Sequence, residues 1–179
     1  MMNLNQKRRD TALAKELLAV EKQEKKMEQA ALKAKPAAWK TELESWIPEW
    51  FKPLAYAMIL LREEGTPCVF FGDLFGVPHD KIPAVRELET LLHLRRDKGW
   101  GEQTDYFDHP NVIGWTRGSG MAVVLSNGGD GWKRMRIGYP GETFVDALGN
   151  RSEEIVIGPD GWADFTVNGG SVSVWVPKA

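Results

Sequence analysis

The stretch from position 105 to 109 gathers acidic side chains and a histidine in one short loop. Asp105, Asp108 and His109 lie within five consecutive positions. Carboxylate oxygens are hard ligands that suit calcium, and an imidazole nitrogen suits transition metals. The cluster is therefore a weak candidate for a cation site with hard or mixed ligands, and no metal site is predicted on it.

Tryptophan side chains form a second group that could bind a ligand, because the apolar face of a sugar ring stacks on an aromatic plane. Trp132 lies in a glycine-rich turn and Trp162 follows an Asp-Gly pair, so both are candidates for exposure and sugar stacking. Trp115 and Trp175 lie inside β-rich runs and are expected to pack in the core or between domains. Packing remains the simpler interpretation for all four side chains.

Three further polar sites are weaker candidates for catalysis. Asp73 follows a short apolar run, the position at which barrel enzymes hold catalytic groups, but it has no acidic partner at a readable spacing. Anchoring of a loop through hydrogen bonds is therefore the preferred interpretation of Asp73. His79 and Asp80 are expected to form a loop pair, and His93 is expected to be structural or exposed.

The elements that must position these residues begin with an apolar helix predicted over Trp50–Glu64. A buried strand is predicted over Cys68–Phe71, because a short, continuous apolar run is typical of a strand covered on both faces. A second helix is predicted over Pro83–Lys98. Cys68 is the single cysteine, so an internal disulfide is excluded and its thiol is expected to be packed.

The pattern changes from residue 105 onward to short β-rich runs separated by glycine, asparagine, aspartate and proline. Alternation of apolar with polar or small residues predicts an antiparallel sandwich with one buried face in each sheet. The expected strands are Val112–Thr116, Met121–Ser126, Lys133–Ile137, Thr143–Ala147, Glu154–Ile157, Trp162–Val167 and Val172–Val176.

The N-terminal stretch differs from the remainder in charge. Residues 1–35 hold nine Lys/Arg and five Asp/Glu, whereas the remainder holds 14 and 20. Strong helix formers predict one exposed helix over residues 4–35, either a solvated extension or a helix that binds a partner. The chain therefore divides into a helical extension at 1–40, a segment at 41–104 and a β-rich domain at 105–179.

Several stretches of the sequence closely resemble the C-terminal part of bacterial liquefying-type α-amylases. The resemblance covers about residues 41–178 and rests on WFKPLAYA, PCVFFGD, TDYFDH, VIGWTR, GNRSE and GWADFTVNGGSVSVWVP. It implies an incomplete (β/α)8-barrel segment comprising the last helix, strand and helix, followed by an antiparallel β-sandwich C-domain. Together with the N-terminal helix expected from composition, this predicts an α+β chain.

The resemblance also implies what this chain does not carry. The family cleaves α-1,4-glucosidic bonds of starch with retention, using carboxyl groups that follow the fourth, fifth and seventh barrel strands. The chain resembles only the region after those strands, so no catalytic residue is expected and the chain should be inactive alone. Some family members bind a calcium ion, and the positions of its ligands correspond to Pro110, Asn111 and Asn127 in this chain. Because amide and backbone oxygens bring no charge, this site is expected to be weak or absent.

Three functions remain open from the sequence. The chain is either an inactive α-amylase fragment whose exposed apolar faces favour self-association, a non-catalytic module that binds α-glucan or completes the barrel of a partner, or a helix-mediated scaffold. Acidic residues mixed into the basic N-terminus argue against nucleic-acid binding. The absence of an apolar signal region and of a spanning run predicts a cytoplasmic protein without a membrane contact, although related full-length enzymes are often secreted.

Overall fold

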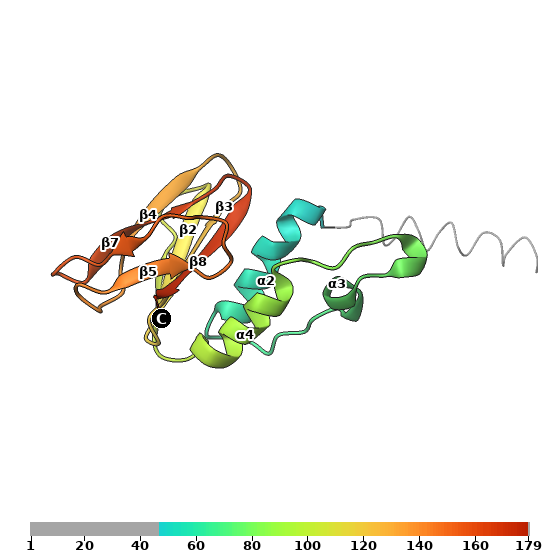
Figure 1. The fold of residues 1–179 in the computed structure, drawn as a ribbon, viewed down its shortest axis with the longest axis horizontal. Coiled ribbons are helices and arrows are strands. Elements are labelled where there is room, and N and C mark those ends of the chain that lie inside the picture. Colours follow the sequence, from blue (N-terminus) through green and yellow to red (C-terminus); the bar gives the residue numbers. More distant parts are fainter. Residues whose placement is uncertain (1–46, 179) are drawn as a thin grey trace, which may run out of the picture. The chain divides into compact units, whose positions relative to one another are not determined.

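The computed structural model describes residues 47–178, so the predicted helix over residues 4–35 and the extension at 1–40 lie outside the described residues. The described chain begins with a helical part (Figure 1). Its elements are η1 (Glu49–Phe51), α2 (Lys52–Leu61), α3 (Phe71–Phe75), η2 (Pro78–Asp80) and α4 (Leu88–Lys98). None of the helices in this part of the chain is long and apolar enough to cross a membrane.

The second part of the described chain is a β-sandwich. A six-stranded sheet has the order β1-β2-β3-β8-β5-β6, and β4 pairs with β7 in a two-stranded sheet. All of these pairs are antiparallel, which confirms the predicted sandwich. The strands are β1 (Gln103–Tyr106), β2 (Val112–Arg117), β3 (Met121–Ser126), β4 (Gly131–Arg136), β5 (Thr143–Asp146), β6 (Ile155–Val156), β7 (Trp162–Val167) and β8 (Ser171–Pro177).

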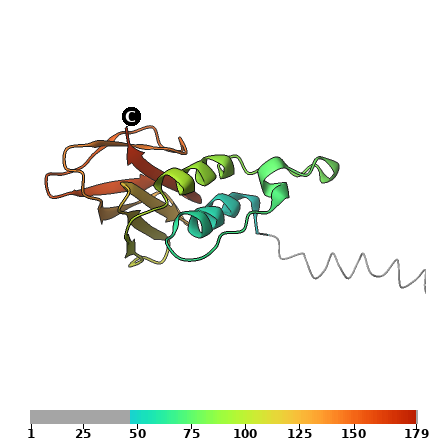
Figure 2. The same cartoon turned by 90° about the horizontal axis from the view of Figure 1, so that it is seen from below.

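The central strand β3 is buried on both faces. Successive side chains of a strand point to opposite faces of the sheet. Met121, Val123 and Leu125 pack in a cluster with leucines of α2 and α4, whereas Ala122 and Val124 pack with side chains of β4 and β7. The six-stranded sheet is thus the middle layer: Figures 1 and 2 show α2 and α4 side by side against it, with β4 and β7 across from them.

Both predicted helices are shorter than expected. Helix α2 ends at Leu61 rather than Glu64, because Arg62 is extended and the Glu63 N–H donates to the Gln103 side chain on β1. Helix α4 begins at Leu88 rather than Pro83. The Val85 N–H before it donates to the Asp73 carbonyl at 2.7 Å, which holds that segment outside the helix.

The strand predicted over Cys68–Phe71 is wrong. The chain is irregular up to Phe70 and enters α3 at Phe71. Phe70 is 64% and Phe71 is 71% exposed, and the thiol of Cys68 is also exposed rather than packed. A strand needs a neighbour for its backbone groups, and the paired strands of residues 47–178 all belong to the sandwich, apart from the Val77–Ile82 bridge.

Two further differences concern the sandwich. Strand β1 was not expected, because Gln-Thr-Asp-Tyr lacks an apolar alternation; its pairing with β2 at the sheet edge stabilises it. In β8 the second face is buried as well as the first, because Ser173 and Trp175 pack towards β7 while Val172 and Val174 pack towards the helices. The predicted one-faced burial holds for β7, where Ala163, Phe165 and Val167 are buried.

Arg117 joins the helical part to the sandwich. Its guanidinium donates to the carbonyls of Leu61 at 3.3 Å, Gly99 at 3.1 Å and Gly101 at 3.2 Å. The Trp115 indole N–H also donates to the Leu61 carbonyl, at 3.3 Å. Burial lowers the pKa of Arg117 from its usual value. These bonds satisfy carbonyls at the ends of α2 and α4, where a helix leaves acceptors without partners.

Candidate functional site

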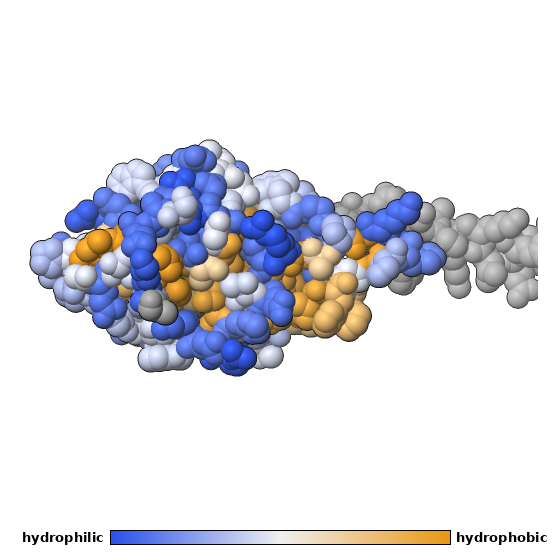
Figure 3. Space-filling model, in the orientation of Figure 1, coloured by the Kyte–Doolittle hydropathy of each residue, from blue (hydrophilic) through white to orange (hydrophobic). Residues whose placement is uncertain are grey.

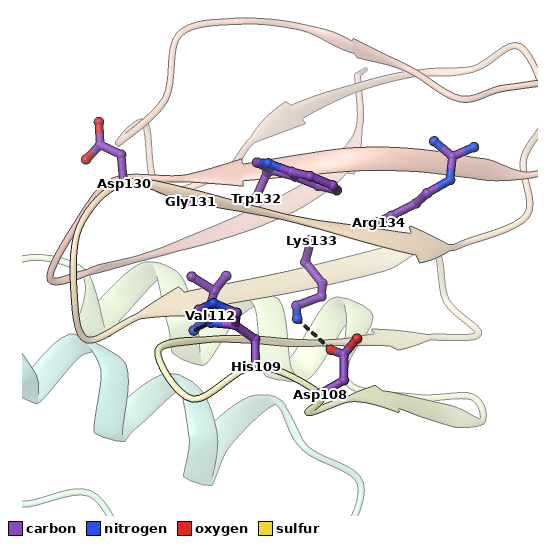
Figure 4. Close-up of a pocket in the computed structure, with 8 residues that line it drawn as sticks. All are labelled: Asp108, His109, Val112, Asp130, Gly131, Trp132, Lys133 and Arg134. Atoms are coloured by element: carbon purple, nitrogen blue, oxygen red, sulfur yellow. Dashed lines mark hydrogen bonds and ion pairs between the residues drawn. The ribbon is translucent and has the colours of Figure 1, made fainter.

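A hollow with polar lining lies beside β4 (Figure 4), and we call it the Trp132 groove. Its volume is about 540 Å³. The lining residues come from β4 and from the loop before β2; they are Asp108, His109, Val112, Asp130, Gly131, Trp132, Lys133 and Arg134. Within residues 47–178, β4 pairs only with β7, so its other edge has no strand partner. The groove therefore combines a strand edge, an aromatic ring and charged side chains.

The strand period of β4 places Trp132 at the surface. Along β4, Lys133 and Met135 are buried while Trp132 and Arg134 project outward, and Trp132 is 60% exposed. Trp132 therefore lies at the start of a strand rather than in the predicted turn. Trp162 is half-buried, packs edge-on against Tyr106 with 6.2 Å between ring centroids, and does not line the groove.

Charged side chains of both signs surround Trp132. The Lys133 ammonium lies 2.6 Å from an Asp108 carboxylate oxygen, and this hydrogen bond lowers the pKa of Asp108. The side chain of Lys133 is 9% exposed and that of Asp108 is 80% exposed, so the ion pair lies at the mouth of the groove. The Arg134 guanidinium lies 3.3 Å from an Asp164 carboxylate oxygen. An Asp130 carboxylate oxygen accepts a hydrogen bond from the Gly169 N–H at 2.7 Å.

The cluster expected at positions 105–109 is divided between two places. Asp105 lies on β1 and pairs with Arg62 at 3.3 Å. His109 Nδ1 accepts from the backbone N–H groups of Asn111 and Val112 at 3.1 and 3.0 Å, which turns this nitrogen away from a metal. Residues 47–178 contain no group of three His, Cys, Asp or Glu side chains placed to hold a metal ion.

The positions implied for calcium lie at a different hollow. Pro110, Asn111 and Asn127 line a cavity of about 180 Å³ whose other walls are apolar: Phe51, Leu54, Met58, Ile113 and Leu125. Calcium binds six to eight oxygens and is favoured by carboxylates. The lining of this cavity offers no carboxylate, and the Asn111 carbonyl already accepts from the Asn127 N–H. The residues present therefore do not fit calcium.

A second feature of the described surface is apolar, and we call it the phenylalanine face. It consists of Phe70, Phe71 and Phe75, which are 64%, 71% and 63% exposed. The rings of Phe71 and Phe75 pack against each other with centroids 4.6 Å apart. Figure 3 shows apolar residues gathered over the helical part on the side of α3. Exposed apolar side chains gathered in one region are typical of an interaction site when the patch is large.

Asp73 holds the phenylalanine face on α2, which confirms its interpretation as an anchor. Its carboxylate accepts from Lys52 Nζ at 2.9 Å and from the Tyr56 hydroxyl at 2.6 Å. Burial and the hydrogen bond to Asp73 raise the pKa of Tyr56 to about 12. Burial alone would lower the pKa of Lys52, but its bonds to Glu49 and Asp73 raise it.

The remaining polar residues form structural contacts or lie free at the surface. His79 and Asp80 form an exposed pair at 2.9 Å, as expected, and His93 is exposed on α4. Burial alone would raise the pKa of Glu153, but hydrogen bonds from Thr166 and Arg151 lower it to about 2. These contacts tie the loop before β6 to β7.

Sequence reasoning found Trp132, Asp108 and His109 but did not place them in one groove, and it missed Lys133 and Arg134. The alternation in Gly-Trp-Lys-Arg-Met-Arg is the signal that could have found them. It places Lys133 on the buried face of β4 and Arg134 on the outward face, which it shares with Trp132.

Comparison with known proteins gives one consistent result. The family model described as "Alpha-amylase C-terminal" matches residues 121–176. An α-amylase of Geobacillus stearothermophilus is 51% identical over 146 residues, which is 76% of this chain and 27% of that protein. A glucan 1,4-α-maltohexaosidase of Bacillus sp. (strain 707) is 47% identical over 146 residues, covering 76% of this chain and 28% of that protein.

Two further comparisons extend this result. A cytoplasmic α-amylase of Escherichia coli is 44% identical over 152 residues, covering 75% of this chain and 31% of that protein. The solved structure of an α-amylase from Malbranchea cinnamomea has the same fold over 69% of this chain and 32% of its own, with a TM-score of 0.54 and 18% identity. The chain thus spans less than a third of the length of these relatives.

Proposed function

Because this chain is related to the C-terminal part of bacterial α-amylases, we propose that residues 47–178 are the non-catalytic closing part of such an enzyme. In this role the sandwich is a stable base, and the helical part presents the phenylalanine face to a barrel. The enzyme cleaves α-1,4-glucosidic bonds with carboxyl groups that lie outside residues 47–178. The chain of 179 residues is therefore inactive on starch by itself.

The carboxyl groups of the described chain support this proposal. A retaining glycosidase needs two carboxyl groups about 5–5.5 Å apart, one of them with a raised pKa so that it can donate a proton. Among residues 47–178, shifted carboxyl pKa values occur at Asp97, Asp108 and Glu153, and all three are lowered. For Asp97 the cause is its hydrogen bond with Arg96. Carboxylates stabilised in the ionised form are poor general acids at neutral pH.

The phenylalanine face is the observation that carries the proposal. Phe70, Phe71 and Phe75 are each more than 60% exposed, whereas Phe144, Phe165 and Trp175 in the core of the sandwich are fully buried. Burying three such rings against a partner would stabilise an interface by about 1.5–3 kcal/mol for each ring. Asp73 already fixes the backbone between these rings, so the face is organised before a partner arrives.

A reducing-end assay on soluble starch tests the absence of activity. We expect no release of reducing ends by the purified 179-residue chain under conditions in which the G. stearothermophilus α-amylase is active. Steady turnover that co-purifies with the chain through two different columns would contradict the proposal.

Co-purification tests the barrel-completing role. The bait is the portion of the G. stearothermophilus α-amylase outside its aligned 146 residues. We expect this portion to retain the 179-residue chain, and the triple variant Phe70→Ser, Phe71→Ser, Phe75→Ser to lose retention. Val156→Ser is the matched control, because Val156 is 64% exposed on β6 in the sandwich. Equal retention of the triple variant would contradict this role.

A further inference from the structure

We propose that Asn127 is a site of spontaneous deamidation, at which the side-chain amide is converted to aspartate and isoaspartate without an enzyme. The inference does not depend on the function proposed above. It rests on a comparison within the chain: the sequence holds two Asn-Gly pairs, Asn127-Gly128 and Asn168-Gly169, and each is followed by a further glycine. Matching local sequences give both pairs similar intrinsic reactivity, so the fold decides which of them reacts.

Deamidation at an Asn-Gly pair is an attack of the glycine backbone nitrogen on the asparagine side chain. The Gly128 nitrogen gives its proton to hydroxide or a buffer base and forms a bond to Asn127 Cγ. The Cγ–Nδ2 bond breaks, Nδ2 takes a proton from water and leaves as ammonia, and a five-membered succinimide ring remains. Water then adds to either ring carbonyl and opens the ring to aspartate or isoaspartate. Glycine permits the attack because it has no Cβ to crowd the ring.

The Asn127-Gly128 pair lies in the exposed connection between β3 and β4. The Asn127 N–H donates to the Asn111 carbonyl at 3.1 Å, which fixes the backbone before the reacting atoms. Within residues 47–178, no hydrogen bond restrains the Asn127 side chain, so its Cγ is free to turn towards the Gly128 nitrogen. The Gly128 N–H donates to the Ser126 hydroxyl at 3.2 Å. This bond to a neutral acceptor lies at the long end of the usual range and opposes the reaction little.

The Asn168-Gly169 pair is held at the atoms that the reaction needs. Asn168 Nδ2 donates to the Asn150 carbonyl at 2.8 Å, and Asn168 Oδ1 accepts from the Arg151 guanidinium at 2.7 Å. The Gly169 N–H donates to an Asp130 carboxylate oxygen at 2.7 Å. A carboxylate at this position disfavours the negative charge that forms on the nitrogen when it loses its proton. Three bonds, two of them to charged groups, must therefore break before Asn168 reacts.

The product changes the junction between the sandwich and the helical part. Asn127 lines the cavity whose apolar walls include Phe51 and Leu54. Aspartate places a negative charge at the rim of this cavity, and isoaspartate adds a methylene group to the backbone where β3 ends. A preparation of the chain should therefore divide with time into the parent and a more acidic form.

Peptide mass spectrometry of the aged 179-residue chain tests the inference. Trypsin cuts after lysine and arginine and places Asn127 and Asn168 in separate peptides, residues 118–133 and 152–178. Each peptide holds one asparagine and no glutamine, so a mass gain in either peptide reports one residue. At mildly alkaline pH we expect Asn127 to deamidate at least tenfold faster than Asn168 in the folded chain, because three hydrogen bonds hold the Asn168-Gly169 pair.

Unfolding and two variants serve as controls. In concentrated urea both asparagines should deamidate at similar rates, since their local sequences match. Gly128→Ala should slow the reaction at Asn127 at least tenfold, because a Cβ crowds the attacking nitrogen. This Cβ would lie 3.4 Å or more from its nearest neighbours, in the Asn111 side chain, so the variant fits the fold. Gly129→Ala is the matched control, because a Cβ there meets nothing within 4 Å, and it should leave the rate unchanged.

Thermal unfolding of both variants establishes that they fold. Equal rates at Asn127 and Asn168 in the folded chain would overturn the inference, as would a rate at Asn127 that Gly128→Ala leaves unchanged. An equal loss of rate in Gly128→Ala and Gly129→Ala would also overturn it, because the freedom of the whole turn, and not the attack by the Gly128 nitrogen, would then set the rate.

Discussion

The aromatic rings in the core of the sandwich and those at α3 of the helical part differ in burial. Phe144, Phe165 and Trp175 of the sandwich are fully buried, whereas Phe70 and Phe71 of the helical part are mostly exposed. The reason is where the packing partners lie in the chain. Every face of β3 and β8 is covered by other strands or helices of residues 47–178, but the phenylalanine face has no such cover. The sandwich is therefore complete, and the helical part has a face prepared for a partner.

The largest difference between the two parts should appear when one aromatic ring is removed from each. Trp175→Ala should lower the free energy of unfolding by about 3–5 kcal/mol, because it empties a fully buried site. Phe71→Ala should change it by less than about 0.5 kcal/mol, because that ring is exposed. Urea unfolding monitored by circular dichroism measures both; similar losses would mean that the phenylalanine face is buried in solution.

The junction between the two parts should give the next largest effect. Arg117→Met keeps the length of the side chain but removes the donors to the carbonyls of Leu61, Gly99 and Gly101. We expect the free energy of unfolding to fall by about 2–3 kcal/mol, because three hydrogen bonds from a charged donor are lost and the Leu61 carbonyl keeps only its bond from the Trp115 indole. Arg136→Met, an exposed position on β4, is the control and should be near neutral. If both variants lose the same free energy of unfolding, Arg117 does not stabilise the junction through these hydrogen bonds.

Alkaline pH should weaken the anchor of the phenylalanine face. The pKa of Tyr56 is raised to about 12 in the folded chain, above the usual 10. The unfolded chain therefore releases this proton first, so the stabilisation is complete below pH 10 and is lost as the pH rises towards 12. Tyr56→Phe should lower stability by about 1 kcal/mol at pH 7 and should flatten the profile between pH 10 and 12. Urea unfolding across this range measures how the free energy of unfolding changes with pH. If Tyr56→Phe shows the same change as the parent chain, another group causes it.

Calcium should have the smallest effect. The cavity lined by Asn111 and Asn127 offers no charged ligand. We therefore expect chelation with EDTA, or addition of about 5 mM calcium, which exceeds the ~1 mM dissociation constants of the weakest extracellular sites, to shift the midpoint of thermal unfolding by less than about 1 °C. Differential scanning calorimetry measures this shift. A clear rise with calcium, lost in Asn127→Ala, would show that a metal bridges the two parts.

The outcome of the sequence predictions follows the same division. All seven expected strands form, because the alternation of β7 and the continuous apolar run of β3 have their partners within the chain. The run at Cys68–Phe71 has an equally apolar pattern but no strand to pair with among residues 47–178. The hydrophobic pattern of a segment shows which side chains can be buried. Whether they are buried depends on the strands and helices that pack against the segment in the fold.

The Trp132 groove shows a second limit of the sequence. Trp132 was selected for its glycine-rich surroundings, yet its exposure comes from the alternation of β4. Asp108 and Lys133 are 25 positions apart in the chain and meet only because β4 lies across β2. Such a contact between distant residues has no local signal.

Hydrogen–deuterium exchange at Cys68 and Val69 tests the central claim most directly. Among residues 47–178, no hydrogen bond is made by the N–H of either residue, whereas Val123 pairs with β2 and β8. We predict rapid exchange at Cys68 and Val69 in the chain alone, slow exchange after addition of the barrel portion of the G. stearothermophilus α-amylase, and slow exchange at Val123 in both samples. Slow exchange at Cys68 and Val69 in the chain alone, or no change on addition of the barrel portion, would contradict the claim that the helical part awaits a barrel.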